Sequence, residues 1–552
     1  MISRRDFLKG GAAGVSALAT ASLVPGWRSV YASTQSDLVF KLYPHHWMPE
    51  VKFAYAADEM DDPFKSATQV TQEGIVVPKE MSDRRFSVNA RWFVPGFGFV
   101  NLAADNAGEY YSAKDFVSTK SRVLNFEFAR SRVSRNERIR MQYENAGTKF
   151  SSEARHLLAL SDELFDDAQK KQHDGERCAR LADQALHYAL GAGEKMELER
   201  AASATEQWPR TDNVYFGCES RQYIWAKSEE FTKRFVELFN FATVTHYVWD
   251  TWYELFEPSE GEYNWGVKDN IVNWLGKNNI TIQGRPLFWF HPSVTPDWLK
   301  NKNLDEVKRY VERHTRDVVS HYGDRVLQWE VVNEYHDWGN IHDHTPEQIT
   351  DIVRLACDKT KEVNPHVTRI INNCCLWAEY AAMGRRARAD ATRPQRSARK
   401  FIEDLLNAGV DFDVIGIQIY FPRRDLSDIV RMVERFERFG KPIYITEIGA
   451  SAGPLQQAIA TGEQTLPTEP YDWHRYWDEE LQADWLEQVY TLYYSRQSIK
   501  AINWYDFSNF RPFIHNGGLV REDCSTKASF HRLENLLQKW NRLPGEVNGV
   551  ME

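Results

Sequence analysis

Short apolar runs alternate with amphipathic stretches along the second half of the chain. The runs are continuous, and the stretches between them repeat their apolar positions with the period of a helix. Apolar strands separated by helices predict a parallel sheet covered by helices on its outer face. The expected strands are 214–218, 241–245, 284–290, 326–332, 369–372, 414–420, 442–446 and 501–507. Eight such units predict a (β/α)₈ barrel, the TIM-barrel class of α/β fold, over residues 209–545.

A doubly wound sheet is the alternative fold for the same pattern. No Gly-x-Gly-x-x-Gly follows any of the expected strands, and the chain has no Walker A loop. The barrel is therefore the preferred prediction.

The first part of the chain has a different pattern. Residues 33–135 mix aromatic and β-branched residues with Gly and Pro, and 122–133 alternates apolar and polar positions, which predicts a small β-rich, sandwich-like domain. Residues 136–208 have few β-branched residues and helical spacing, which predicts a helical connector interrupted at Gly191–Gly193. The aromatic residues of the β-rich domain are either core or a sugar-binding platform: Trp92, Phe93, Phe97, Phe99, Tyr110 and Tyr111.

The first residues resemble an export signal. Arg4 and Arg5 stand in Ser-Arg-Arg-Asp-Phe-Leu-Lys, ahead of a weakly apolar stretch too short to cross a bilayer comfortably. Small residues up to Ala32 suggest a cleavage point. We predict a twin-arginine signal peptide at 1–32, with an ordinary secretory signal as the alternative. The mature protein is expected in the periplasm or outside the cell, without a membrane span.

Composition narrows the possible partners. The 552 residues carry a net charge of −10, so the chain lacks the basic surface typical of nucleic-acid binding. None of the six cysteines has the spacing of a zinc site, and the adjacent Cys374 and Cys375 suit neither a metal nor an ordinary disulfide. No metal is expected, and the oligomeric state stays open.

Two glutamates follow expected strands directly. Asn333 and Glu334 end the fourth strand, and Glu447 ends the seventh. In a (β/α)₈ barrel the chemistry lies at these carboxyl ends, and strands four and seven are nearly opposite. Two opposed carboxylates are the machinery of glycoside hydrolysis, in which one donates a proton and the other attacks or stabilises the sugar. Capping or salt bridging is the alternative role for each.

Several segments carry a family resemblance. "WEVVNE" (329–334), "ITEIGA" (445–450), "GRPLFWFHPSVTPDW" (284–298), "VIGIQIYF" (414–421) and "INWYDFSNF" (502–510) resemble glycoside hydrolase family 10, the xylanase family of retaining barrel enzymes. The resemblance implies that Glu334 is the general acid/base and Glu447 the nucleophile. It also implies that Asn333 holds the sugar 2-hydroxyl and that Gln418 lies near the nucleophile. Trp289 and Trp504 would line the subsite where the bond is cut.

The sequence also departs from the family pattern. Arg285 and Tyr420 stand where histidines are expected, and His291 matches only with a shift. The usual Glu-Asn pair and Lys after the second strand are not recognisable. We expect Tyr420 to donate to Glu447. Arg285 is expected to form a structural ion pair, or else to contact a uronic-acid substituent.

These features predict an exported retaining glycoside hydrolase that cleaves a β-linked plant polysaccharide, in the manner of an endo-1,4-β-xylanase. The alternatives are a glycosidase of the same mechanism on another β-glycan and a non-hydrolytic carbohydrate-binding protein. Two carboxylates and water suffice for the reaction, so no cofactor is expected. Glu334 should have a raised pKa, because it lies near aromatic residues and a second carboxylate.

Overall fold

A computed structural model describes residues 36–46, 51–117, 121–249, 255–336, 339–386, 388, 390–420, 423–453 and 473–544. Ser36–Glu552 form one compact unit. The predicted signal peptide at 1–32 lies outside the described residues.

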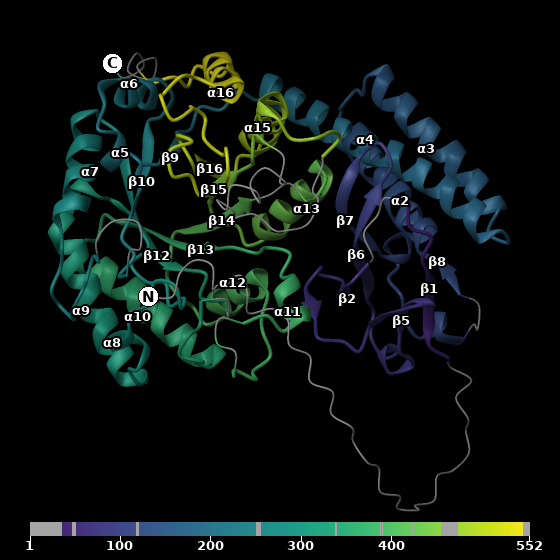
Figure 1. The fold of residues 1–552 in the computed structure, drawn as a ribbon, viewed down its shortest axis with the longest axis horizontal. Helices are drawn as coiled ribbons and strands as arrows, with labels where there is room; N and C mark the ends of the chain where they lie inside the picture. Colours follow the sequence, from purple (N-terminus) through teal and green to yellow (C-terminus); the bar gives the residue numbers. More distant parts are fainter. Residues whose placement is uncertain are drawn as a thin grey trace, which may run out of the picture. The chain divides into compact units, whose positions relative to one another are not determined.

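The predicted barrel is confirmed (Figure 1). Every neighbouring pair of its strands is parallel, and the sheet closes between β16 and β9. The third strand ends earlier than expected, because Phe288 and Phe290 make only isolated bridges. The strands are β9 (Tyr215–Glu219), β10 (Phe241–Thr245), β11 (Thr281–Arg285), β12 (Gln328–Asn333), β13 (Thr368–Asn373), β14 (Val414–Tyr420), β15 (Ile443–Gly449) and β16 (Ile499–Trp504).

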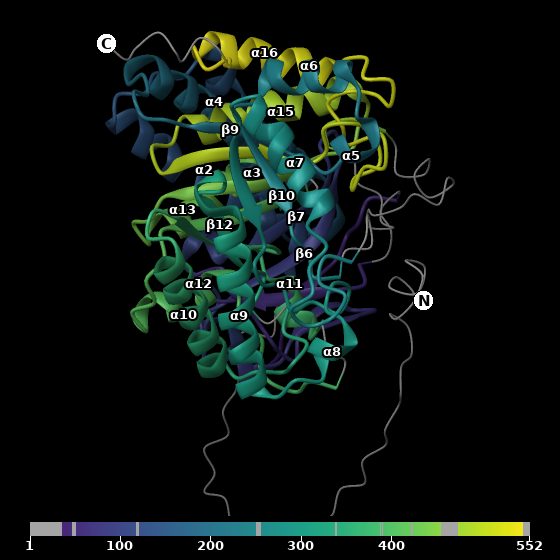
Figure 2. The same ribbon diagram turned by 90° about the vertical axis from the view of Figure 1, so that its left-hand side faces the viewer.

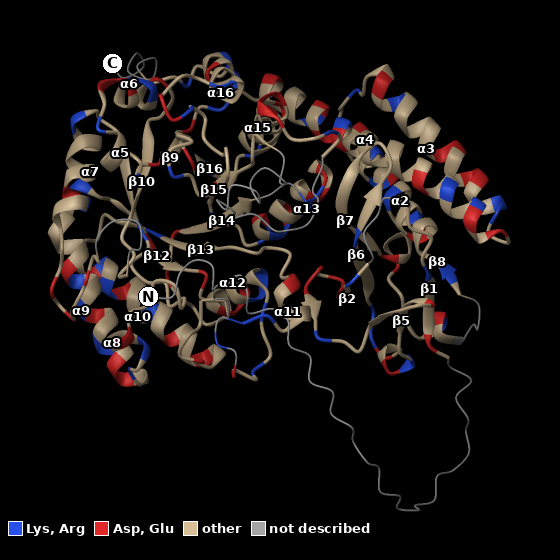
Figure 3. Ribbon diagram, in the orientation of Figure 1, with Lys and Arg blue, Asp and Glu red and all other residues tan. Residues whose placement is uncertain are grey.

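Amphipathic helices cover the outside of the barrel (Figures 1 and 2). In α9 the buried positions include Val307, Val311 and Val318, at helical spacing. Charged residues of both signs share the same helix, as Figure 3 shows for α9. The main helices around the barrel are α6 (Glu229–Leu238), α7 (Gly266–Lys277), α9 (Leu304–Tyr322), α10 (Pro346–Val363), α12 (Ala398–Asn407), α13 (Leu426–Glu437), α15 (Glu479–Tyr494) and α16 (Ala528–Lys539), with short α5 (Tyr223–Ala226), α8 (Asp297–Lys300) and α11 (Glu379–Met383).

Two four-stranded sheets precede the barrel, as expected of a β-rich region. One has the order β4-β5-β1-β8 and the other β3-β2-β6-β7. Trp92, Phe97 and Tyr111 are buried and Phe93 and Phe99 are partly buried, which favours core packing over a sugar platform. The strands are β1 (Leu38–Lys41), β2 (Ala54–Ala57), β3 (Pro63–Phe64), β4 (Gln69–Thr71), β5 (Gly74–Val77), β6 (Ser87–Val94), β7 (Gly98–Ala104) and β8 (Arg122–Val123).

The predicted strand at 122–133 is wrong. Only β8 is extended, and helix α2 runs from Leu124 to Asn145. The polar positions of the alternation are buried rather than facing water. Asn125 donates to Asp183 at 2.9 Å, and Glu127 accepts from Tyr111 at 2.7 Å. Tertiary partners therefore satisfy these side chains inside the protein, and the alternation does not mark two faces of a strand.

The predicted break at Gly191–Gly193 is also wrong. Helices α3 (Ser152–Lys170) and α4 (Gly175–Gln207) form the connector, and α4 continues through both glycines. A Cβ at Gly193 would lie 3.0 Å from Asn136 Oδ1 and 3.5 Å from Ser427 Cβ. The glycine therefore serves close packing against α2 and α13 rather than a turn.

Buried ion pairs join the first part of the chain to the barrel. Arg132 of α2 binds Asp425 through two hydrogen bonds, of which the Nη1–Oδ1 distance is 2.8 Å. The Asn101 backbone N–H of β7 donates to the Arg423 carbonyl at 2.9 Å. Asp425 and Arg423 lie in the loop after β14, so the N-terminal region supports the loop that leaves a strand of the candidate site.

Candidate active site

Glu334 lies at the carboxyl end of β12, as predicted. Its backbone N–H donates to the Asn372 carbonyl at 2.9 Å, and its φ is 53°, in the left-handed region. Such a conformation is strained for a glutamate and is found most often at functional sites. Only 6% of the residue is exposed. The surrounding strands therefore hold this carboxyl in a buried, imposed orientation.

Glu447 lies near the end of β15 and accepts hydrogen bonds from two strong donors. The Tyr420 hydroxyl donates to Oε2, and the Arg285 guanidinium donates to Oε1. The hydrogen bond expected from Tyr420 to Glu447 is therefore present, and contact of Tyr420 with a substrate stays a prediction. Arg285 is fully buried and forms the structural ion pair, which was one of its two predicted roles. Burial and the charge of Glu447 keep the Tyr420 pKa well above its usual value, so the phenol remains a donor.

Amides connect the two glutamates. The Gln418 amide donates to Glu334 Oε1 at 2.9 Å and to Asn333 Oδ1 at 3.2 Å. The Asn372 amide donates to Asn333 Oδ1 at 3.2 Å and reaches Glu447 Oε1 at 3.5 Å. Both bonds to Asn333 use its oxygen. Its amide nitrogen takes no part in these two bonds, and contact of this group with a sugar stays a prediction.

The protonation of Glu334 suits a general acid. Burial first, and then the negative charge of Glu447, raises its pKa to about 7. Hydrogen bonds from Gln418 and Cys374 oppose this shift by stabilising the ionised carboxylate. Glu334 can therefore carry a proton near neutral pH while Glu447 accepts from Arg285 and Tyr420. This is the division of roles that a pair of glycosidase carboxylates requires.

Two predicted aromatic positions differ in exposure. Trp289 is partly exposed and stacks on His291 with ring centroids 4.9 Å apart. Burial lowers the pKa of His291 to about 4, so this ring is neutral at neutral pH. Trp504 is fully buried and its indole N–H donates to Gly517 at 2.9 Å. Contact of Trp289, His291 and Trp504 with a sugar stays a prediction.

The sequence reasoning missed a third carboxyl in the barrel. Glu330 lies two residues before Val332 in β12 and is fully buried. Burial raises its pKa to about 8, so it is protonated at neutral pH. The available signal was a glutamate between Trp329 and Val331 within the expected strand. The interior of the barrel below the two candidate catalytic groups is therefore polar.

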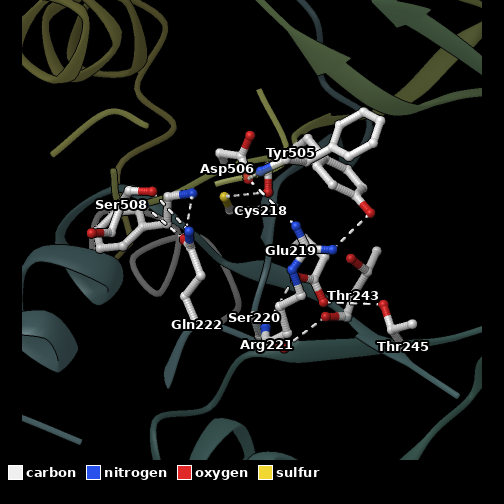
Figure 4. A network of polar contacts seen from close by, with 12 residues as sticks. Cys218, Glu219, Ser220, Arg221, Gln222, Thr243, Thr245, Tyr505, Asp506 and Ser508 are labelled. Carbon is white, nitrogen blue, oxygen red and sulfur yellow. Dashed lines mark hydrogen bonds and ion pairs between the residues drawn. The ribbon is translucent and has the colours of Figure 1, made fainter. Parts of the chain in front are cut away.

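A second missed cluster lies beside the Arg285–Glu447 pair. Figure 4 shows Arg221 between Glu219, Asp506 and Tyr505. The Arg221 guanidinium donates to the Tyr505 hydroxyl at 3.0 Å, and it approaches Glu219 at 3.3 Å and Asp506 at 3.5 Å. Arg285 lies over the same Tyr505 ring, 5.1 Å from its centroid. These buried groups come from β9, the loop after β9, β11 and the residues after β16, so no local motif reveals them.

Comparison with known proteins defines the family. The family model "Glycosyl hydrolase family 10" matches residues 207–527, more than half of the chain. The chain belongs to glycosyl hydrolase family 10. In this family 10 chain, a model of the twin-arginine translocation signal also matches residues 1–21, which confirms the predicted export signal.

Curated relatives of this family 10 chain are xylanases. It is 28% identical over 265 residues to endo-1,4-beta-xylanase A of Halalkalibacterium halodurans, covering 44% of this chain and 61% of the relative. It is 27% identical over 250 residues to endo-1,4-beta-xylanase B of Thermotoga neapolitana, covering 43% and 66%. The chain thus spans less than two thirds of the length of these relatives.

Solved structures of xylanases are also similar to the family 10 chain. Xylanase 10B of Thermotoga petrophila in complex with xylobiose is 22% identical, with a TM-score of 0.45, covering 61% of this chain and 96% of that chain.

Among the described residues, no helix has the length and apolar character of a membrane span. Within the same residues, no group of three or more His, Cys, Asp or Glu side chains could hold a metal ion.

Proposed function

We propose that this chain hydrolyses a β-1,4-linked xylan or substituted xylan with retention of the anomeric configuration. The observation that carries the proposal is the unequal environment of the two strand-end glutamates. Glu334 is buried with a pKa of about 7, whereas Glu447 is held by a guanidinium and a phenol. Family membership and xylanase relatives support the same reaction.

The chemistry follows from these roles. The Glu447 carboxylate attacks the anomeric carbon while Glu334 transfers its proton to the leaving oxygen, and the glycosidic bond breaks. Glu334 then takes a proton from water, which attacks the same carbon and releases Glu447. The amide nitrogen of Asn333 donates to the sugar 2-hydroxyl in both steps. A retaining enzyme needs the two carboxyl groups about 5 to 5.5 Å apart, and this separation stays a prediction.

Substitution of the two glutamates tests the proposal. Glu447→Ala should lose nearly all turnover on every substrate. Glu334→Ala should lose turnover on xylan but keep more on an activated aryl xyloside, because a good leaving group needs no acid. Azide should partly rescue Glu334→Ala on the aryl substrate. Glu362→Ala, whose side chain is 68% exposed, is the matched control and should behave like the parent. Near-normal hydrolysis of xylan by Glu447→Ala would refute the assignment.

Another β-glycan is the second candidate substrate. Arg285 and Tyr420, which hold Glu447, occupy positions where the family resemblance implied histidines. The Glu-Asn pair and the Lys after the second strand, which the resemblance implies for binding the neighbouring sugar, are also not recognisable in this sequence. In this second proposal the recognition of that sugar differs from the family pattern. A panel of xylan, glucuronoxylan, mannan and mixed-linkage glucan distinguishes the two candidates. Preference for a glycan other than xylan, with the same dependence on both glutamates, would favour the second.

We also propose a division of the chain into a signal peptide at 1–32, a β-rich region, a helical connector and the barrel at 209–545. In this proposal the β-rich and helical regions support the barrel rather than bind sugar. The buried Arg132–Asp425 pair and the burial of Trp92 are the supporting observations. The mature chain would act in the periplasm or outside the cell.

A further inference from the structure

Two adjacent cysteines lie beside the acid/base carboxyl and take no part in the proposed mechanism. The Sγ atoms of Cys374 and Cys375, just after β13, are 3.3 Å apart. The Cys374 thiol is buried, its Sγ lies 3.9 Å from His336 Nε2, and it interacts with the Glu334 carboxyl, whose pKa it lowers. Cys375 is exposed, whereas the other five cysteines are buried. The pair therefore consists of one sulfur exposed to solvent and one buried beside the Glu334 carboxyl.

We propose that Cys374 and Cys375 are a modification site, which forms a disulfide by exchange with a low-molecular-weight disulfide and thereby tunes Glu334. The first part of the proposal concerns only the two sulfurs. The second part rests on the proposed function, because it assigns Glu334 the acid/base role.

The exchange proceeds in two balanced steps. The Cys375 thiolate attacks one sulfur of the external disulfide, forms a mixed disulfide and releases one thiolate. Cys374 then attacks the Cys375 sulfur, and its proton passes to the departing sulfur, which leaves as the second thiol. The protein pair is oxidised by two electrons, and the external disulfide is reduced to two thiols. Access to Cys375 and the short distance between the sulfurs favour this order.

The resulting bond should be reversible. Ordinary disulfides join Cα atoms about 4.4 to 6.8 Å apart, whereas adjacent residues have Cα atoms only about 3.8 Å apart. A disulfide formed under such strain, at the surface, is more easily reduced than a structural one. The twin-arginine signal directs the chain out of the cytoplasm, to compartments where disulfides persist. The ratio of disulfide to dithiol in this pair would therefore depend on the redox potential of the compartment outside the cytoplasm.

Disulfide formation removes the Cys374 S–H, which interacts with the Glu334 carboxyl. The Cys374 thiol lowers the pKa of the carboxyl by stabilising its ionised form. A disulfide has no S–H to donate, so oxidation should raise that pKa. The alkaline limb of the rate profile should then move upward by about 0.5 to 1 pH unit, as expected for loss of a weak donor.

Mass spectrometry of the full chain tests the disulfide. After treatment with glutathione disulfide, the protein should lose the mass of two hydrogen atoms, with Cys374 and Cys375 joined in one peptide, and dithiothreitol should reverse the change. Cys375→Ser should form no internal disulfide. Cys524→Ser, which alters a buried cysteine elsewhere, should respond like the parent. A lasting glutathione adduct without the internal bond, or no reaction, would overturn the proposal.

The pH profile of kcat/KM tests the tuning of Glu334. The oxidised parent should show the upward shift, Cys374→Ala should show it without oxidant, and Cys375→Ser should be insensitive to oxidant. An unmoved limb in the oxidised parent would overturn this part. If the reduced chain hydrolyses no glycan, the proposed function fails separately. The Glu334 titration is then followed by ¹³C NMR of labelled glutamate, assigned with Glu334→Gln, and must show the same shift.

Discussion

Replacing Glu334 with glutamine should stabilise the folded chain at neutral and alkaline pH while removing the proton donor. Burial and the charge of Glu447 raise the Glu334 pKa from 4.5 to about 7. The unfolded state therefore releases this proton at a lower pH than the folded state, and stability falls as pH rises between the two values. The difference between these two pKa values costs roughly 3.5 kcal/mol of stability once the pH is well above both.

Glutamine avoids this cost because it does not ionise and has nearly the same shape. The gain in the free energy of unfolding should be absent near pH 4, where both states are protonated, and should reach roughly 3 kcal/mol at pH 8. Urea unfolding at pH 4, 6 and 8 measures it. Glu362→Gln, with its side chain 68% exposed, is the control and should show no such gain. A Glu334→Gln variant that is no more stable than the parent at pH 8, or equally stabilised at every pH, would refute the reasoning.

Three further predictions concern the support of the site and export. Gln418→Met removes the amide that donates to Glu334. It should move the alkaline limb of the kcat/KM profile upward by about 1 to 2 pH units, because a hydrogen bond to an ionised group contributes about 1.5 to 3 kcal/mol. An unmoved limb would show that this amide does not stabilise the Glu334 carboxylate. Arg132→Met should lower the free energy of unfolding by about 3 to 5 kcal/mol, because it leaves Asp425 as a buried unpaired charge. Restoration of stability in the double variant that also carries Asp425→Leu would support this cause. The combined Arg4→Lys and Arg5→Lys substitutions should retain folded, active protein in the cytoplasm; fractionation that finds efficient export would contradict it.

Local patterns carried most of the barrel prediction. All strands but the third, and helices such as α9 and α13, lie where apolar runs and helical periods indicated, whereas β11 is Thr281–Arg285 instead of 284–290. The pattern works because each barrel strand is buried on both faces and each covering helix on one. It failed at 122–133, where Asn125 finds its partner in Asp183 of α4. Alternating polarity predicts exposure only if the polar side chains have no partner inside the protein.

The order of the strands along the chain was sufficient to place Glu334 and Glu447 at opposed strand ends. In a closed (β/α)₈ barrel the order of the strands in the sequence is also their order around the barrel. The family resemblance also implied that Gln418 and Tyr420 lie near these glutamates, and both lie on β14, which adjoins β15. What the sequence could not decide is which group carries the proton. That depends on burial, on the Arg285–Glu447 pair and on the Cys374 thiol, which come from three different strands or loops. Protonation is set by the sum of desolvation and nearby charges, and only the tertiary structure brings these together.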